Sequence, residues 1–204
     1  RRFNHSARRM CMPEVDEAFM LHSLKELIRL EEDWVPRNEG TSLYIRPTMI
    51  ASEPMLGVRP AEEYLCYIIV CPVAAYYKGG LAPVKIWISD HYVRAADGGT
   101  GEVKTGGNYA ASLYAAREAA EKGYDQVLWL DAKEKKFIDE CGPANFFGIK
   151  DNTFITPESH SILPSITNRS LQDLAKQMGM KVEVRPVPVE ELSPFEEAGA
   201  CGTA

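Results

Sequence analysis

The chain has 204 residues and a formal net charge of −6, with 45% hydrophobic and 25% charged residues, as in a typical globular protein. This length allows a sizeable core in one domain or in two small ones. The net negative charge argues against nucleic acid or an anionic membrane surface as a partner. The longest apolar run, "YIIVCPVAAYY", contains a proline and is too short to cross a bilayer, so we expect no membrane association.

The cysteines and histidines give no metal-ligand spacing. There are five cysteines and four histidines, and no two cysteines form a C-x-x-C pair. We therefore expect no metal ion, and free thiols in a reducing cytoplasm. The cysteines are Cys11, Cys66, Cys71, Cys141 and Cys201.

The first part of the chain predicts one helix, two strands and a linker. Apolar residues recur at helical spacing across residues 13–30, with acidic residues near the start of the segment. Residues 41–50 and 63–73 are rich in β-branched and aromatic residues and predict strands. The segment 72–83, rich in glycine and alanine between two prolines, predicts an interdomain linker. The expected domains are thus residues 1–71 and 84–204.

The second part predicts a new alternation of strands and helices. A strand is expected over 84–95, followed by a glycine-rich loop and a helix that ends at Gly123. Further expected elements are a strand over 125–131, extended segments over 135–157 that meet at the turn "KDNT", a helix over 166–179 and a closing strand over 181–189. This mixture of hairpin-like strands and separate helices predicts an α+β fold, and not a doubly wound parallel sheet.

The loop "GGTGEVKTGGNY" raises two functional hypotheses. A phosphate-binding P-loop requires a glycine directly before its lysine, but Val103 occupies that position. A β-branched residue resists the positive φ that such turns commonly need, and the dinucleotide motif G-x-G-x-x-G fails at Lys104. The other hypothesis is a lysine that forms a Schiff base with an aldehyde cofactor such as pyridoxal phosphate. That cofactor needs a carboxylate at its ring nitrogen, a hydrogen-bond partner at its phenolic oxygen, and a helix N-terminus with an arginine at its phosphate.

Several blocks of the chain resemble those of branched-chain amino-acid aminotransferases, which are fold-type IV, pyridoxal-phosphate-dependent enzymes. The blocks are "SLYIRPTMIASEPMLGV", "HYVRAADGGTGEVKTGGNY", "ECGPANFFGI", "SILPSITNRSL" and "CGTA", in the order of that family. The resemblance covers essentially the whole chain, although family members extend well beyond both of its ends. It implies an α+β, fold-type IV architecture of two domains joined by a linker, similar to D-amino acid aminotransferase.

The resemblance also implies a role for individual residues. Lys104 matches the catalytic lysine that forms the Schiff base with pyridoxal 5'-phosphate. The remaining cofactor contacts would come from Arg2, Tyr109, Glu140, Ile166, Thr167 and Thr203. Tyr44 and Arg46 match positions on the side of the substrate carboxylate, where backbone amides of Thr203 and Ala204 would assist.

Each of these residues also has a purely structural interpretation. Lys104 could be a solvated surface charge, and Glu140 could be an edge-strand charge that discourages aggregation. Thr167 suits a helix N-cap whatever binds nearby, Arg46 could be an ion-pair partner, and Arg2 could lie in a disordered end. The combination and order of the blocks favour the functional interpretation.

The resemblance implies transamination of leucine, isoleucine and valine with 2-oxoglutarate, which gives branched-chain 2-oxo acids and L-glutamate. It also implies a cytoplasmic homodimer whose partner chain closes part of the site. Two alternatives remain open. One is another reaction on the same fold, such as that of a D-amino acid aminotransferase or a 4-amino-4-deoxychorismate lyase. The other is a truncated chain that keeps the fold without catalysis.

Overall fold

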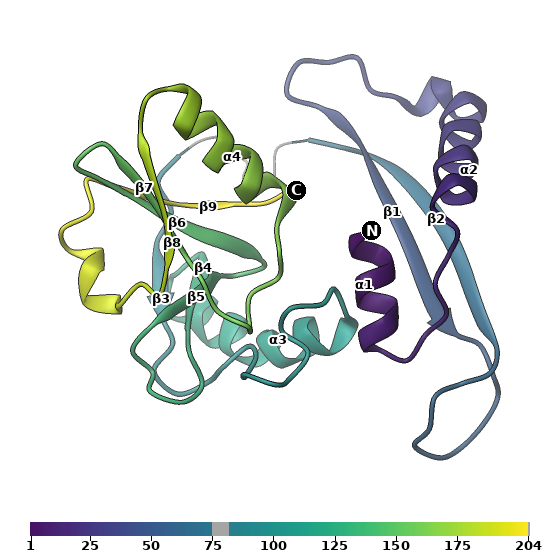
Figure 1. The fold of residues 1–204 in the computed structure, drawn as a ribbon, viewed down its shortest axis with the longest axis horizontal. Coiled ribbons are helices and arrows are strands. Elements are labelled where there is room, and N and C mark those ends of the chain that lie inside the picture. The colour runs from purple at the N-terminus through teal and green to yellow at the C-terminus, as the bar shows by residue number, and fades with distance from the viewer. Residues whose placement is uncertain (75–81, 204) are drawn as a thin grey trace. The chain divides into compact units, whose positions relative to one another are not determined.

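The computed structural model describes residues 1–74 and 82–203, which form two units, Arg1–Ala82 and Pro83–Thr203 (Figure 1). Residues 75–81, which make up most of the predicted linker, and Ala204, a predicted substrate contact, lie outside the described residues.

The first unit contains two helices and a two-stranded antiparallel sheet. Its elements are α1 (Arg2–Arg9), α2 (Glu17–Leu30), the short 3₁₀ helix η1 (Glu32–Trp34), β1 (Ser42–Ala51) and β2 (Tyr64–Val73). The carboxylate of Asp16 accepts the N–H of Phe19 at 2.7 Å, so α2 begins at this cap and not at Pro13 as the apolar spacing suggested. Strand β2 continues through Val73, so the first residues of the predicted linker belong to the sheet.

The second unit is built on a seven-stranded mixed sheet. Its strands are β3 (Ile86–Ile88), β4 (Gln126–Leu130), β5 (Ile138–Cys141), β6 (Ala144–Lys150), β7 (Thr153–Pro157), β8 (Lys181–Arg185) and β9 (Glu197–Cys201). The order is β3-β4-β5-β6-β7-β8, with β9 paired to β6. Only β3–β4 and β7–β8 are parallel, and the other described pairs are antiparallel. The predicted α+β class is therefore confirmed.

Two helices and a short 3₁₀ segment complete the second unit. They are α3 (Gly106–Glu121), α4 (Ile166–Gln177) and η2 (Val189–Leu192), and α4 packs beside β8 (Figure 1). Gly123 has a φ of 81°, which confirms the left-handed end predicted for the helix of this region. Asp151 and Asn152 have φ values of 48° and 54°, so the predicted "KDNT" turn is a tight hairpin between β6 and β7.

Three strands differ from the sequence-based expectation, and one of them, β8, ends at Arg185 and not at residue 189. Strand β3 ends at Ile88, well before residue 95, because the Ser89 hydroxyl donates to the carbonyl of Tyr92 and turns the chain away from the sheet. Strand β9 was not expected, since "EAGAC" has no β-branched or aromatic residue. Its small residues suit its place, because a Cβ on Gly199 would lie 2.6 Å from the ring of Phe147.

Strand β4 joins two hydrophobic clusters, one on each face of the sheet. Val127 and Trp129 pack against Ala115 and Ala119 of α3. Alternation along the strand places the intervening leucines in the second cluster, whose members are Leu128, Leu130, Ile138, Cys141, Phe146, Ile155 and Val187. Burial on both faces explains why this strand is apolar throughout. The small alanines allow α3 to lie close to β4, so the helix is fixed against the core. The loop that leads into α3 is therefore held at its C-terminal end.

No helix in the described parts of the chain is both long enough and apolar enough to cross a membrane.

Candidate active site

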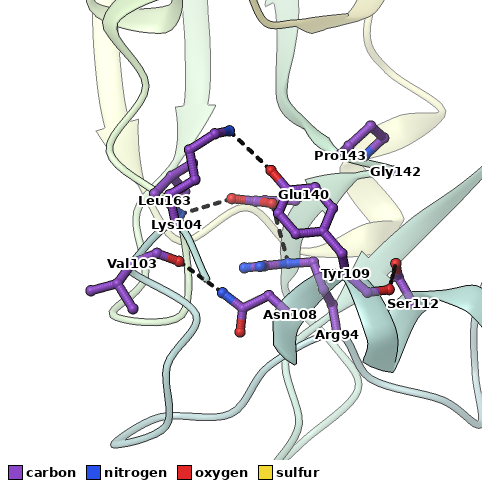
Figure 2. A pocket seen from close by; sticks show the side chains of 10 residues that line it. All are labelled: Arg94, Val103, Lys104, Asn108, Tyr109, Ser112, Glu140, Gly142, Pro143 and Leu163. Carbon is purple, nitrogen blue, oxygen red and sulfur yellow. Dashed lines mark hydrogen bonds and ion pairs between the residues drawn. The ribbon is translucent and has the colours of Figure 1, made fainter. Parts of the chain in front are cut away.

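A pocket in the second unit brings the glycine-rich loop, with Arg94 shortly before it, together with three other segments. These are the start of α3, the β5–β6 turn and the loop that leads into α4 (Figure 2). Its lining residues are Arg94, Val103, Lys104, Asn108, Tyr109, Ser112, Glu140, Gly142, Pro143 and Leu163. Lys104, Tyr109 and Glu140, which were singled out from the sequence, therefore line one pocket, although Glu140 lies far along the chain from the other two.

Lys104 and Tyr109 meet across the start of α3. Val103 is 1% exposed and anchors the loop in the core, so that the chain emerges at Lys104 directly before the helix. Tyr109 lies in the first turns of α3, and its hydroxyl oxygen accepts a hydrogen bond from the Lys104 Nζ at 2.9 Å (Figure 2). An amine in contact with a phenol, at a pocket wall, is an arrangement that can serve nucleophilic and acid–base chemistry.

Glu140 is a buried carboxyl on β5, and only 4% of it is exposed. Its Oε1 accepts the backbone N–H of Leu163 at 2.8 Å, and its Oε2 lies 3.2 Å from the Nε of Arg94 (Figure 2). Strand β5 lies between β4 and β6 in the sheet. Glu140 therefore cannot be the exposed edge-strand charge considered above.

Burial raises the pKa of Glu140 to about 7, because an ionised carboxylate is poorly solvated there. The positive charge of Arg94 and the N–H of Leu163 oppose this rise by stabilising the carboxylate, and Lys104 adds a smaller effect of the same sign. Asp139 raises the pKa further through charge repulsion. Glu140 can thus hold either a proton or a negative charge near neutral pH, and its neighbours decide which.

Arg94 is a charged pocket residue that the sequence did not single out. Its guanidinium donates to the carbonyl of Ser161 and, at 3.4 Å, to the carbonyl of Gly101 in the lysine loop. Within the part of the chain that the structure describes, its Nε–H makes no hydrogen bond, so its contact with Glu140 is an ion pair. An arginine within "HYVRAADGG" carries no spacing signal of its own, because its partners lie far along the chain.

The N-terminus of α4 follows closely on the pocket wall at Leu163. The cap residue is Ser165, whose side chain accepts the N–H of Asn168 at 3.1 Å. Thr167 is therefore not the cap; it lies with Ile166 in the first turn, where helix geometry leaves backbone N–H groups without an intrahelical acceptor. Such free N–H groups, together with the helix dipole, favour an anion.

Thr203 follows the end of β9 and is exposed. Cys201 of this strand pairs with Asn145 at the start of β6. A Cβ on Gly202 would lie 3.7 Å from the Cβ of Ala144, next to the β5–β6 turn that lines the pocket. The structure thus brings the segment of Thr203 beside the same turn.

Arg2, Tyr44 and Arg46 belong to the first unit. Arg2 is the first residue of α1, so it lies in a helix and not in a disordered end. Tyr44 and Arg46 are two residues apart on β1 and share one face of the strand. The guanidinium of Arg46 lies 5.1 Å from the centroid of the Tyr44 ring, a cation–π distance.

All five cysteines are free thiols, with Cys141 and Cys201 buried. Within the described ranges, no group of three or more histidine, cysteine, aspartate or glutamate side chains could hold a metal ion.

A family model described as "Amino-transferase class IV" matches residues 1–204. The chain belongs to this family, as its sequence blocks indicated.

Named relatives and solved structures support this assignment. The chain is 48% identical over 215 residues to a branched-chain-amino-acid aminotransferase of Mycolicibacterium smegmatis, covering 100% of this chain and 58% of that protein. It is 47% identical over 210 residues to branched-chain-amino-acid aminotransferase 2 of Bacillus subtilis, with the same coverage of 100% and 58%. The chain thus spans somewhat more than half the length of these curated relatives.

The solved structures have the same fold. A T.th. branched-chain amino acid aminotransferase with pyridoxamine 5'-phosphate superposes with a TM-score of 0.86 at 27% identity, covering 100% of this chain and 65% of that one. The branched-chain amino acid aminotransferase from Escherichia coli gives a TM-score of 0.75 at 28% identity, covering 100% and 64%. The expected fold-type IV architecture is confirmed.

Proposed function

We propose that this chain forms part of a pyridoxal-phosphate-dependent transaminase that moves the amino group of leucine, isoleucine or valine to 2-oxoglutarate. The products would be the branched-chain 2-oxo acids and L-glutamate. The observation that carries the proposal is the pocket in which the Lys104 amine contacts the Tyr109 phenol beside the buried carboxyl of Glu140. The names of the relatives support the substrate class.

The residues of the pocket fit this cofactor. When bound, pyridoxal phosphate supplies an aldehyde for a lysine amine and a ring that withdraws electrons from the substrate. Lys104 would be that lysine, and the Tyr109 hydroxyl would bind the phenolic oxygen of the ring. Glu140 would face the ring nitrogen, since each of its carboxylate oxygens has only one partner among the described residues and keeps a lone pair free.

The phosphate would be held at the N-terminus of α4. The first-turn amides of Ile166 and Thr167 suit an anion, and we assign Thr203 and Arg2 as further phosphate contacts from the family's pattern. Tyr44, Arg46 and the backbone of Thr203 and Ala204 would bind the substrate carboxylate. These assignments make Arg46 the charge partner that distinguishes an amino acid from a simple amine.

Lys104 and Glu140 would act at different atoms: Lys104 at the α-carbon of the substrate and Glu140 at the ring nitrogen of the cofactor. Once the substrate has displaced it, the Nζ of Lys104 would remove the proton from the α-carbon and later return it, as general base and general acid. Tyr109 would orient this amine through the observed contact of 2.9 Å. Glu140 would face the ring nitrogen with a pKa of about 7, a value that burial raises and that Arg94 and the Leu163 N–H keep from rising further, so that it could hold or release a proton there.

We further propose that the protein acts as a homodimer in the cytoplasm. The class IV family and the five free thiols support these two assignments.

The test is a visible absorption spectrum of the full-length protein with pyridoxal phosphate, before and after excess L-leucine. We expect a yellow, lysine-bound form that L-leucine bleaches, and none of this in Lys104→Ala. The control, Lys133→Ala, changes an exposed lysine outside the pocket lining and should behave as the wild type.

Other outcomes would contradict the proposal in distinct ways. Bleaching by D-leucine but not by L-leucine would indicate a D-amino acid aminotransferase. Bleaching by neither, with pyruvate released from 4-amino-4-deoxychorismate, would indicate the lyase. A protein that stays colourless with added pyridoxal phosphate would indicate a chain that keeps the fold without catalysis.

A further inference from the structure

The start of α3 is not held by a side-chain cap. Helices α2 and α4 each begin at a cap residue whose side chain accepts a backbone N–H, namely Asp16 and Ser165. Helix α3 begins at Thr105 without a side-chain cap bond, and its first two residues are Gly106 and Gly107. Glycine is a poor helix former, so local preference alone does not fix where this helix starts. Another interaction must hold the junction between the lysine loop and the helix.

The side chain of Asn108 supplies that interaction. Its Nδ2 donates to the carbonyl of Thr100 at 2.7 Å and to the carbonyl of Val103 at 2.8 Å. Its Oδ1 accepts the hydroxyl of Thr100 at 2.9 Å. Both amide hydrogens and the amide oxygen are thus used, and Asn108 is only 8% exposed. The two carbonyl acceptors also define the amide orientation, because a flipped amide would set oxygen against oxygen.

These bonds act directly on the position of Lys104. The carbonyl of Val103 belongs to the peptide group that precedes Lys104, so the bond from Asn108 fixes the orientation of that peptide plane. Figure 2 shows this bond between the loop and the helix. The next residue of α3, Tyr109, holds the far end of the same lysine through its hydroxyl. Consecutive residues of one helix therefore fix the backbone of Lys104 and its amine.

The lysine loop is also closely packed at Gly101, which leaves its backbone little room to move. A Cβ on Gly101 would collide with the carbonyl oxygen of Ser161 and lie 2.6 Å from the Cβ of Ala95. Val103 is 1% exposed and is fixed in the core. The loop is therefore confined at Gly101 and Val103 by close neighbours and is bound at Thr100 and Val103 by Asn108.

We propose that Asn108 is a positioning residue for Lys104. This inference rests on the proposed function, in which Lys104 bonds to an aldehyde cofactor. Asn108 lines the pocket, but the bonds described above use all its donors on the loop backbone, so it acts through the Val103–Lys104 peptide. Loss of its donors would leave the pocket chemistry present and the amine misplaced. Misplacement of about 1 Å can cost a reacting group on the order of a hundredfold in rate.

The test measures how fast Lys104 captures pyridoxal phosphate in cofactor-free, full-length protein, followed by visible absorbance across pH. Asn108→Asp keeps the size of the side chain but places a carboxylate oxygen against the two carbonyls, and Asn108→Ala removes all three bonds. We expect each variant to capture the cofactor at least about tenfold more slowly than the wild type. We also expect faster hydrogen exchange at residues 100–105 in the cofactor-free protein.

The control is Asn152→Ala, at the hinge of the β6–β7 hairpin. Asn152 also donates to a backbone carbonyl, that of Gly179 at 3.3 Å, but it lies outside the pocket lining and at the opposite end of β6 from Ala144. This variant should lower the melting temperature and leave the capture rate within about twofold of the wild type. If Asn108 had a purely structural role, its variants would likewise have a lower melting temperature and a capture rate close to that of the wild type.

If both Asn108 variants fail to fold, Thr100→Val decides the matter. This change removes the hydroxyl that donates to the Asn108 Oδ1 and leaves that oxygen without its donor, so we expect slower capture, as in the Asn108 variants. Wild-type capture rates in the folded variants would overturn the inference. Failure of the wild type to capture the cofactor at all would instead overturn the proposed function.

Discussion

Replacing Arg94 with methionine would leave the buried carboxyl of Glu140 without the guanidinium that lies 3.2 Å from it. Methionine keeps most of the length of the side chain and removes both its charge and its donors. Two effects should follow. The carbonyls of Gly101 and Ser161 lose a donor, which costs about 1–3 kcal/mol in stability at any pH. Glu140 also becomes harder to ionise, and this second effect depends on pH.

The sign of the pH effect follows from linkage. Glu140 has a pKa of about 7 in the folded protein against an ordinary value of 4.5, so the folded state binds its proton more tightly than the unfolded chain does. The resulting stabilisation is present at low pH and is lost as the pH rises from about 4.5 to about 7. In the wild type this loss amounts to about 3 kcal/mol.

Without Arg94 the loss continues to higher pH. An opposite charge at this distance typically lowers the pKa of a carboxyl by roughly 1 to 3, so its removal should raise that of Glu140 by a similar amount. At pH 5 Glu140 is protonated in both folded proteins and contributes equally to their stability. By pH 8 the wild type has lost nearly all of the stability that it loses when Glu140 ionises. The variant is still losing stability at pH 8, and its total loss there is about 1 kcal/mol larger than that of the wild type.

Denaturant unfolding at pH 5, pH 8 and pH 9 would measure the free energy of unfolding and separate its pH-independent and pH-dependent losses. We expect the difference between Arg94→Met and the wild type to be about 1 kcal/mol larger at pH 8 than at pH 5, and to grow further at pH 9. In a Glu140→Gln background the pH-dependent part should vanish and the constant part should remain. Arg185→Met, which breaks ion pairs to Glu183 and Glu191 away from the pocket, is the matched control. A difference for Arg94→Met that does not change with pH would refute the electrostatic role of Arg94.

Two further predictions concern packing and thiol reactivity. Gly101→Ala should destabilise the second unit by several kcal/mol because its Cβ meets the Ser161 carbonyl, whereas Gly106→Ala, with nothing within 4 Å, should be neutral or stabilise by up to about 1 kcal/mol; thermal unfolding of both would check this. Burial raises the pKa of Cys141 to about 12 and that of Cys201 to about 11, so both should resist iodoacetamide at pH 8 in the folded protein and react in denaturant, as mass spectrometry would show. Rapid alkylation of either thiol in the native state would contradict the burial described here.

The elements that the sequence predicted well are those with strong local signals. The helix end at Gly123 and the turn at Asp151–Asn152 depend on a few adjacent residues that tolerate positive φ, and both were located correctly. Strand β4 was recognisable because both of its faces are apolar. Strand β9 was not, because its place is set by what β6 presents. The ring of Phe147 admits only a small residue at position 199, and this constraint is invisible in "EAGAC" itself.

In the candidate site, too, features that depend on adjacent residues were predictable and features that depend on distant residues were not. Lys104 and Tyr109 are five residues apart, so a single block of sequence brings them together. The pKa of Glu140, in contrast, depends on the N–H of Leu163, 23 residues away, and on Arg94, whose own anchor at Ser161 is 67 residues away. The loop over 159–165 carries both Ser161 and Leu163 and ends at the Ser165 cap of α4, so it connects the surroundings of Glu140 to the helix start at which we propose the phosphate binds. A displacement of this loop would move the contacts that set the ionisation of Glu140 and also the start of α4. A substitution in the loop should therefore alter the ionisation of Glu140 and the affinity for the proposed cofactor together.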